Sequence, residues 1–235
     1  MSPFQELLAP GTLSRAERTR LRLLQAGLDV FSRKGPDAAS VREIVDVAGQ
    51  NVAAIAYYFG SKEGLYRAVL EAIVRIIRHQ MGAVLASLRQ AGQEGKIDPK
   101  RATALLQTFS REVYLRLLSR EESAPIGRII MREQTQPSAA FDILYNNLFK
   151  EFHEALCGLV GVVLKLDPND REAIIRTHTL MGQVYFFAMS RETILRRLGW
   201  GSLEGNQEEW VADILAEQVR ALLDGLRRNK KGRKR

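Results

Sequence analysis

Apolar and polar residues alternate along the chain with a helical period, and capping residues mark where the first helices begin. Ser14 and Ser40 are each followed three residues later by a glutamate, which is the pattern of a capping box at a helix N-terminus. Gly35-Pro36 ends the first of these helices. Asn51 is a good N-cap for a third, short helix. The N-terminal part of the chain therefore predicts three helices in succession.

The remainder of the chain predicts longer helices that are separated by proline and glycine signals. Ser61 begins a helix that continues towards Gly92, where a polar, glycine-rich connector runs to Lys96. Proline suits the first turn of a helix, because its missing N–H has no partner to lose there. Further helices are predicted from Asp98-Pro99, from Pro125 to about Gln134, from Pro137-Ser138, from Asp167-Pro168 to about Leu198, and from Glu208 to Leu226. No convincing strand alternation is visible, so the predicted fold class is all-α.

The segment from Ser40 to Leu65 joins two short helices through Ala48-Gly49-Gln50. This connection has the length of a helix-turn-helix turn, in which a small residue lets the helices approach and glycine reverses the backbone. Such a pair presents the start of its second helix to base edges in a major groove. The residues expected to face DNA are Arg42, Gln50, Asn51, Ala53, Ala54 and Tyr57. Helix pairs of this kind also occur as purely structural elements, and the turn alone leaves that alternative open.

The continuation of this segment resembles the DNA-binding domain of TetR/AcrR-type regulators. The resemblance extends from Ser14 through the fourth predicted helix start, and the helical remainder of the chain suits the architecture of the family. In that family a turn of small residues and glycine precedes a short helix ending in Tyr-x-Tyr-Phe, and Ser-Lys-Glu-x-Leu follows. The blocks that match in order and spacing are Ala48-Gly49, Tyr58-Phe59 and Ser61-Lys62-Glu63-Gly64-Leu65.

Two departures from the family pattern change the expected reading of DNA. Ala56 replaces the first tyrosine, and Ala54 stands where threonine or serine is common. The recognition face therefore has fewer polar donors, so hydrogen bonds to bases are expected mainly from Arg42, Gln50 and Asn51. It also favours apolar contacts of Ala53 or Ala54 with thymine methyl groups.

The resemblance also implies contacts with the DNA backbone. Lys62 and the amides at the start of the fourth helix are expected to hold a phosphate, which a helix N-terminus favours. Tyr57 is expected to place its hydroxyl on the backbone, which positions the protein without specifying sequence. Arg15, Arg18 and Arg22 are further phosphate candidates.

The C-terminal half resembles the CecR-like subgroup of this family. The resemblance lies in the run from Arg128 to Pro137, the segment after it, and the stretch that ends at Trp200. It implies an effector-binding region, and aromatic and methionine side chains suit a pliable apolar cavity. The candidate ligand-binding residues are Phe109, Tyr114, Met131, Phe149, Phe152, His153, His178, Met181, Tyr185 and Met189. The same side chains at helical spacing also fit an ordinary hydrophobic core, and both histidines fit satisfied interior or boundary positions.

The resemblance places a dimer interface in the last two helices, about Pro168 to Leu198 and Glu208 to Leu226, packed as a four-helix bundle. The last helix agrees with this, because its apolar surface from Trp210 onwards is broad for one partner. A wide apolar stripe packed wholly within one subunit is the alternative.

Composition limits the classes of function rather than selecting one. The chain has 235 residues and one cysteine, Cys157, which excludes an internal disulfide and favours a reducing compartment. Neither a signal peptide nor an apolar run of membrane-spanning length is visible, so we expect a cytoplasmic protein with no membrane partner. The net charge is +8, but the last nine residues hold seven of the basic side chains. Charge alone therefore does not predict DNA binding.

No catalytic, metal or cofactor site is predicted. The three histidines lie far apart in the sequence, and no nucleophile elbow or paired metal-ligand spacing occurs. The segment from Gly92 to Lys96 lacks the preceding strand and the glycine spacing of a phosphate-binding loop. Cys157 is expected to behave as a small buried hydrophobe.

These observations predict three regions and one leading function. Residues 1–60 form a helix-turn-helix DNA-binding domain, 61–226 a helical effector-binding and dimerisation domain, and 227–235 a basic, disordered tail. We expect a ligand-responsive transcriptional regulator, a repressor, that binds double-stranded operator DNA as a homodimer and is released by a small-molecule effector. The alternatives are a helical protein that sequesters a small molecule and uses its helix-turn-helix only structurally, and an enzyme with its pocket in the C-terminal helices.

Overall fold

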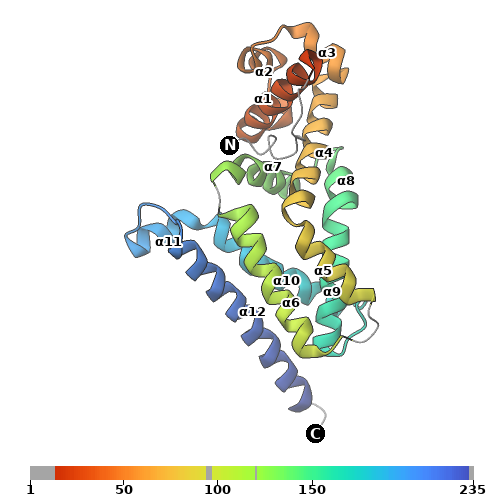
Figure 1. The fold of residues 1–235 in the computed structure, drawn as a ribbon, viewed down its shortest axis with the longest axis vertical. Helices are drawn as coiled ribbons and strands as arrows, with labels where there is room; N and C mark the ends of the chain where they lie inside the picture. The colour runs from red at the N-terminus through yellow and green to blue at the C-terminus, as the bar shows by residue number, and fades with distance from the viewer. Residues whose placement is uncertain (1–13, 94–96, 120, 233–235) are drawn as a thin grey trace. The chain divides into compact units, whose positions relative to one another are not determined.

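The computed structural model describes residues 14–93, 97–119 and 121–232, and within these ranges the chain forms only helices and connecting loops (Figure 1). The predicted all-α fold class is confirmed. The described chain forms two compact units, the first from residues up to His79 together with 121–148, and the second from 80–119 together with the residues from Phe149 onwards. None of the described helices is long and apolar enough to cross a membrane.

The first unit contains the N-terminal helices and a later segment of the chain that packs with them. Its apolar core includes Phe31, Ile44, Ile55 and Leu65, each at most 2% exposed. Helix α1 packs against both α2 and α7. The helices of this unit are α1 (Arg15–Ala38), α2 (Val41–Ala48), α3 (Val52–Phe59), α4 (Lys62–Gln80), α7 (Ala124–Thr135) and α8 (Phe141–Leu144).

The predicted starts of α1 and α2 are confirmed by their capping hydrogen bonds. The Ser14 hydroxyl accepts from the Glu17 amide at 3.2 Å, and the Glu17 carboxylate accepts from the Ser14 amide at 2.8 Å, which completes a capping box. Ser40 accepts from the Glu43 amide at 3.1 Å. The Glu43 carboxylate, however, pairs with Lys34 at 2.8 Å. Only the serine half of the second predicted capping box is therefore present in the described contacts.

The second unit is a bundle built around α6. Helix α6 packs against both α12 and α9, and α9 also packs against α10 and α5. Helix α6 begins at Pro99 as predicted, and the Asp98 carboxylate caps it by accepting from the amides of Lys100 and Arg101 at 2.8 and 3.1 Å. The helices of this unit are α5 (Gly82–Gln93), α6 (Pro99–Val113), α9 (Lys150–Leu164), α10 (Arg171–Met189), α11 (Arg191–Leu198) and α12 (Asn206–Gly232).

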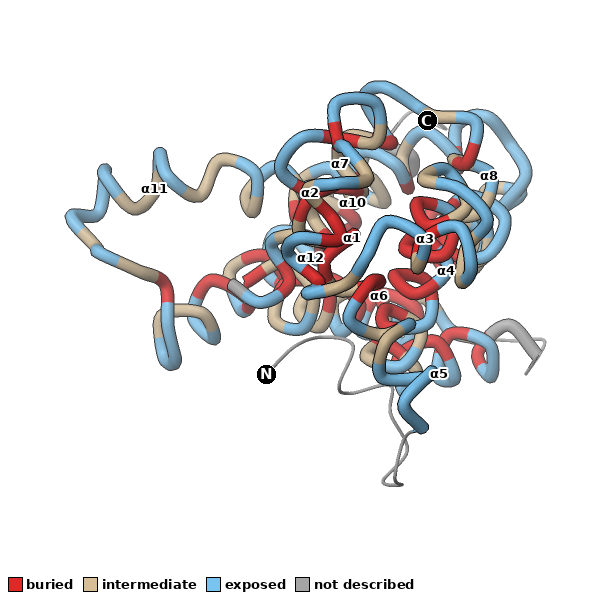
Figure 2. Tube along the Cα trace, turned by 90° about the horizontal axis from the view of Figure 1, so that it is seen from above, coloured by how far each residue is buried: buried red, intermediate tan, exposed pale blue. Residues whose placement is uncertain are grey.

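Two helices that the sequence predicts as continuous are interrupted. The helix expected from Ser61 towards Gly92 divides into α4 and α5 at Met81, next to Gly82, which has a low helix propensity. The helix expected up to Leu198 divides into α10 and α11 at Ser190, whose backbone (φ −95°, ψ 22°) is not helical. Helix α11 has no buried residue (Figure 2). The hydrophobic periodicity of the sequence does not predict such local breaks, because the apolar pattern continues on both sides of them.

The predicted disordered tail is wrong for most of its length. Helix α12 continues to Gly232, so the backbone is helical as far as the structure describes it. The basic residues between Arg227 and Lys231 are good helix formers, and neither proline nor glycine occurs in this stretch. Residues 233–235 lie outside the described ranges.

Candidate nucleic-acid interface and effector cavity

The turn between α2 and α3 has the backbone that a helix-turn-helix requires. Gly49 adopts a left-handed conformation with φ 61°, which glycine occupies without steric strain. The Gln50 amide donates to the Val45 carbonyl at 2.9 Å and so closes the end of α2. Ala48 is buried at 8% exposure, and its small side chain suits a close approach of the two helices. The turn thus holds α3 at a defined position against α2.

Helix α3 buries one side and exposes the other. Ile55 is 2% exposed and anchors the helix, whereas Tyr57 is 83% exposed. Among the residues predicted to face DNA, Arg42, Asn51, Ala53 and Tyr57 are exposed, and Gln50 and Ala54 are half-buried.

Sequence reasoning omitted two exposed positions of α3. Val52 is 58% exposed, and Ala56 is also exposed. Both occupy the same half of the helix as Ala53 and Tyr57. The signal in the sequence was Ile55. A large aliphatic residue at this position is expected to face the core, and the opposite half of this short helix then faces solvent.

The start of α4 is already engaged in contacts within the chain. The Lys62 ammonium donates to the carbonyls of Asp37 and Ala39 at 3.3 and 3.0 Å, and so connects α4 to the loop after α1. Hydrogen bonds from its own amide and from the Ser61 hydroxyl lower the pKa of Glu63. The Gly64 amide at this helix start donates to the Ser61 hydroxyl at 3.0 Å, and the phosphate role of Lys62 stays a prediction.

A buried pair of polar side chains links α4 to α7. The Tyr66 hydroxyl donates to the Glu133 carboxylate at 2.7 Å, and the second carboxylate oxygen accepts from the Ser138 amide at 3.2 Å. Glu133 is 1% exposed. Burial raises the pKa of Tyr66, and the hydrogen bond to Glu133 and the charge of that carboxylate raise it further. The pair joins residues that are 67 positions apart, and sequence reasoning did not predict it.

Arg132 links α7 to the end of α1. Its guanidinium donates to the Phe31 carbonyl at 2.6 Å. A Cβ atom at Gly35 would lie 3.2 Å from this guanidinium, so the glycine allows the close approach. Gly35 also has φ 83°, which interrupts α1 where the sequence predicts its end. Helix α7 is therefore held to the N-terminal helices by contacts with both α1 and α4.

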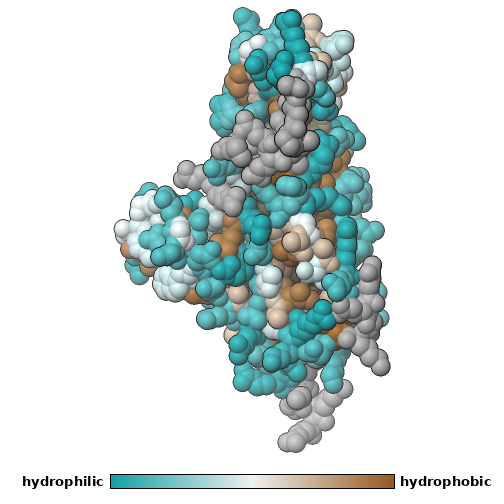
Figure 3. Space-filling model, viewed as in Figure 1, coloured by the Kyte–Doolittle hydropathy of each residue, from teal (hydrophilic) through white to brown (hydrophobic). Residues whose placement is uncertain are grey.

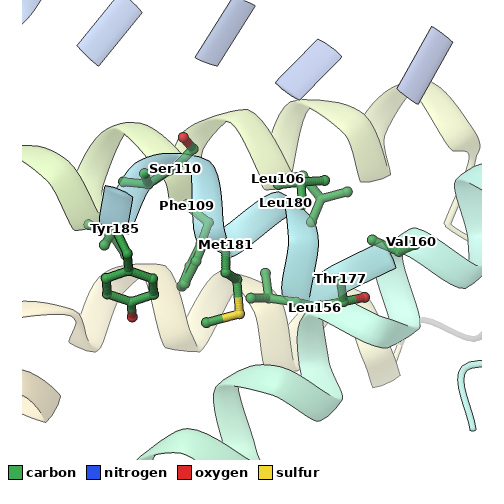
Figure 4. Close-up of a pocket in the computed structure, with 11 residues that line it drawn as sticks. Leu106, Phe109, Ser110, Leu156, Val160, Thr177, Leu180, Met181 and Tyr185 are labelled. Atoms are coloured by element: carbon green, nitrogen blue, oxygen red, sulfur yellow. The ribbon is translucent and has the colours of Figure 1, made fainter. Parts of the chain in front are cut away.

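The second unit contains a small apolar cavity, with about 10 Å³ of free space, between α6, α9 and α10 (Figure 4). Phe109 from α6 and Met181 from α10 lie near the middle of its lining. None of the eleven described lining residues is charged. The buried Ser110 hydroxyl has no hydrogen-bond partner in the described part of the chain. Such a lining suits a small, uncharged, largely apolar molecule.

The structure divides the ten predicted ligand-binding residues. Three of them line the cavity: Phe109, Met181 and Tyr185. Phe152 packs on Phe109 with ring centroids 5.9 Å apart, and Tyr114 packs on Phe187 at 5.8 Å, so these two aromatics support the bundle beside the cavity.

The other predicted ligand-binding residues lie apart from the described lining. Phe149 and His153 are half-buried, and His178 and Met189 are exposed. Met131 lies on α7 in the first unit, since its helix packs against α1. Spacing along a helix does not reveal which neighbours a side chain meets.

Comparison with known proteins decides the family. Residues 23–69 match the family model described as bacterial regulatory proteins, tetR family. Residues 102–226 match the C-terminal domain of the HTH-type transcriptional dual regulator CecR. CecR of Shigella flexneri is 30% identical over 217 residues, which cover 92% of this chain and 96% of the relative.

This chain belongs to the TetR family of transcriptional regulators. Solved structures agree with that fold. A hemolysin II regulator, HlyIIR, aligns with a TM-score of 0.56 at 20% identity, over 77% of this chain and 93% of that chain. AibR, solved with isovaleryl coenzyme A and operator DNA, aligns with a TM-score of 0.62 at 17% identity, over 86% and 97% of the two chains. The resemblance to the CecR-like subgroup is thereby confirmed, and α1–α3 are the helices of a TetR-type DNA-binding domain.

Cys157 and His153 lie one turn apart on α9, and the packing of α10 against α9 brings His178 beside His153. The rings of His153 and His178 have centroids 6.1 Å apart, and Cys157 Sγ lies 3.4 Å from His153 Nδ1. Burial raises the pKa of the Cys157 thiol. Within the described ranges no group of three or more such side chains is placed to hold a metal ion.

We expect the stability of this regulator to fall between pH 7 and pH 5, in part because of His153. Burial lowers the pKa of His153, and the charge of His178 lowers it further against a small opposing effect of Glu154. Below about pH 6.5, the ordinary histidine pKa, the unfolded chain binds this proton more readily than the folded chain does. The His153→Gln variant should therefore lose less thermal stability over this range than wild type. Melting temperatures of the variant and wild type at pH 7 and pH 5 measure this difference in stability loss. A His153→Gln variant with the same pH dependence as wild type would contradict the prediction. His79→Gln, at an exposed histidine, is the control.

Exposed apolar side chains of the regulator concentrate on α10. Ile175, Phe186 and Met189 are 64%, 69% and 60% exposed, and Trp210 at the start of α12 is 54% exposed. Phe186 also lines an open groove of about 420 Å³ between α10, α11 and α12. Apolar residues show at the surface beside α11 (Figure 3). Most of the broad apolar stripe of α12 is instead used within the chain, since Leu215, Val219 and Leu223 are buried.

Proposed function

We propose that this TetR-family protein is a repressor that binds operator DNA as a homodimer and releases it when a small molecule binds the second unit. The exposed α3 of the helix-turn-helix is the observation that carries this proposal. The cavity in the second unit supplies a separate place for an effector. AibR, whose fold is similar, was solved with both a small molecule and operator DNA, which supports the same combination here.

The DNA-binding surface is assigned to Arg42, Gln50, Asn51, Ala53, Ala54 and Tyr57. Arg42 and Gln50 supply the donors, and Tyr57 places its hydroxyl near the backbone. Lys62 contributes by fixing α4 and by adding charge near the start of that helix. Because a single reading helix contacts only a few base pairs, the operator must contain two half-sites for two copies of the chain.

The dimer is assigned to the exposed face of α10 together with the adjoining part of α12. A row of large apolar side chains in water is unfavourable, and burial against a second copy removes it from solvent. Such a dimer lies in the cytoplasm, where its operator is.

The effector is assigned to the apolar cavity that Phe109, Met181 and Tyr185 line. A ligand releases DNA by binding more tightly to a conformer with lower DNA affinity. A difference of about 1–3 kcal/mol between the two conformers is sufficient for such coupling. The absence of charged lining residues in the described part of this cavity favours an uncharged ligand.

The Arg42→Ala variant tests the DNA-binding surface. We expect affinity for DNA from the region upstream of the protein's own gene to fall about tenfold, because Arg42 is an exposed cation at the start of α2. The salt dependence of binding should also weaken by about one charge. Fluorescence anisotropy at several salt concentrations measures both quantities.

The matched control is Arg220→Ala on α12, where the side chain is 68% exposed. This variant should bind DNA as wild type does. Equal DNA affinity of the Arg42→Ala variant and wild type would contradict the assignment of the DNA-binding surface. If wild type binds no DNA while an apolar ligand raises its melting temperature, the sequestering alternative is supported instead.

A further inference from the structure

The solvent-facing side of α3 is almost entirely apolar. The helix has the sequence Val-Ala-Ala-Ile-Ala-Tyr-Tyr-Phe, which contains no charged and no amide side chain. Val52 is 58% exposed, and Ala53 and Ala56 are exposed beside it. Tyr57 supplies the only hydroxyl among the fully exposed residues of this helix. A helix that reads bases with this face has methyl groups to offer rather than donors and acceptors.

Two of the polar side chains next to this face, Asn51 and Lys62, are engaged within the chain. The side-chain oxygen of Asn51 accepts from the Ala54 amide at 3.0 Å and caps α3. This bond occupies the acceptor that a bidentate contact with adenine requires. The Lys62 ammonium is directed to the carbonyls of Asp37 and Ala39. Direct hydrogen bonds from the start of α3 to DNA bases are therefore restricted. The apolar side chains of this helix remain available for contacts with the bases.

The major groove contains one apolar group among the four bases, the C5 methyl of thymine. A methyl group buried between an exposed valine and such a base is removed from water on both sides of the contact. Burial of one methyl-sized group contributes about 0.8 kcal/mol, which corresponds to about fourfold in affinity. This amount is sufficient to distinguish thymine from the other bases at a contacted position.

We infer that Val52 determines operator specificity by contacting a thymine methyl group, and that Ala53 and Ala56 complete the methyl-reading face. The inference rests on the proposed DNA-binding function and names the chemistry that this surface recognises. In each half-site, one or two thymines that face α3 carry this recognition. Arg42 and Tyr57 then position the helix at the groove edge.

Replacement of thymine by deoxyuridine tests the inference. The operator is first located by footprinting with the full-length protein, and each thymine in it is then replaced singly. This change removes the methyl group and leaves the hydrogen-bonding edge of the base unchanged. We expect about a fourfold loss of affinity at one or two positions per half-site, and no loss at the other thymines.

Two valine variants test whether the Val52 side chain is responsible for the preference for thymine over uracil. Val52→Ala should bind the thymine operator about fourfold more weakly than wild type and should no longer distinguish thymine from uracil at the sensitive positions. Val47→Ala, at a valine of α2 that is 52% exposed, should keep the full difference. Both side chains are exposed, so neither variant should change the melting temperature, which is measured alongside.

The outcomes separate the inference from the proposed function. Equal affinity for thymine and uracil at every position overturns the methyl-reading role while DNA binding itself stands. Full discrimination by the Val52→Ala variant overturns the assignment to Val52. Failure of the wild-type protein to bind any DNA removes the proposed function and this inference with it.

Discussion

The Glu133→Ala variant is expected to lose about 3 kcal/mol of its free energy of unfolding. Glu133 is 1% exposed, and its two carboxylate oxygens accept from the Tyr66 hydroxyl and the Ser138 amide. Alanine leaves both donors without this partner and opens a space between α4 and α7. A buried donor without a partner costs about 1–3 kcal/mol, so the two losses together account for the expected effect. Urea denaturation followed by circular dichroism measures it.

A double-mutant cycle separates the hydrogen bond from the loss of packing. Tyr66→Phe removes only the hydroxyl, and Glu133→Met removes the carboxylate while keeping a side chain of similar length. The coupling energy in the combined variant should be about 1.5–3 kcal/mol, the range for a hydrogen bond to a charged group. Glu71→Ala, at an exposed glutamate of α4, is the matched control and should stay close to wild type. A Glu133→Ala variant as stable as this control would show that the pair does not hold α7 in place.

Substitution of aspartate for both Ile175 and Phe186 is expected to convert the proposed dimer to monomers. These side chains are 64% and 69% exposed, so the change should leave each folded subunit intact while placing charge on the proposed interface. Because two linked reading heads bind far more tightly than one, operator affinity should fall by about a hundredfold or more. Sedimentation velocity gives the oligomeric state, and anisotropy with the same operator gives the affinity.

The control for this variant introduces a single aspartate at another exposed apolar position. Tyr145→Asp, in the first unit at 46% exposure, should leave the sedimentation of the protein unchanged. A double variant that sediments like wild type would exclude the α10 face as the dimer interface. Loss of DNA binding without a change in sedimentation would instead place these side chains in another role.

The sequence by itself determined the features that depend on close neighbours along the chain. The capping box at Ser14, the caps at Asn51 and Asp98, and the glycine turn at Gly49 are all present as predicted. Each of these features joins atoms within a few residues of one another, so the local order of side chains contains the information. The helix-turn-helix and the all-α class follow from them.

Only the tertiary structure decided which distant side chains meet. The Tyr66–Glu133 pair, the tether of Lys62 to the end of α1, and the packing of α7, which carries Met131, against α1 join segments far apart in sequence. An apolar residue at helical spacing has the same pattern whether it lines a cavity, fills a core or faces a second subunit. Burial distinguishes these roles, and burial is a property of the folded chain, because it depends on every segment that packs around the residue.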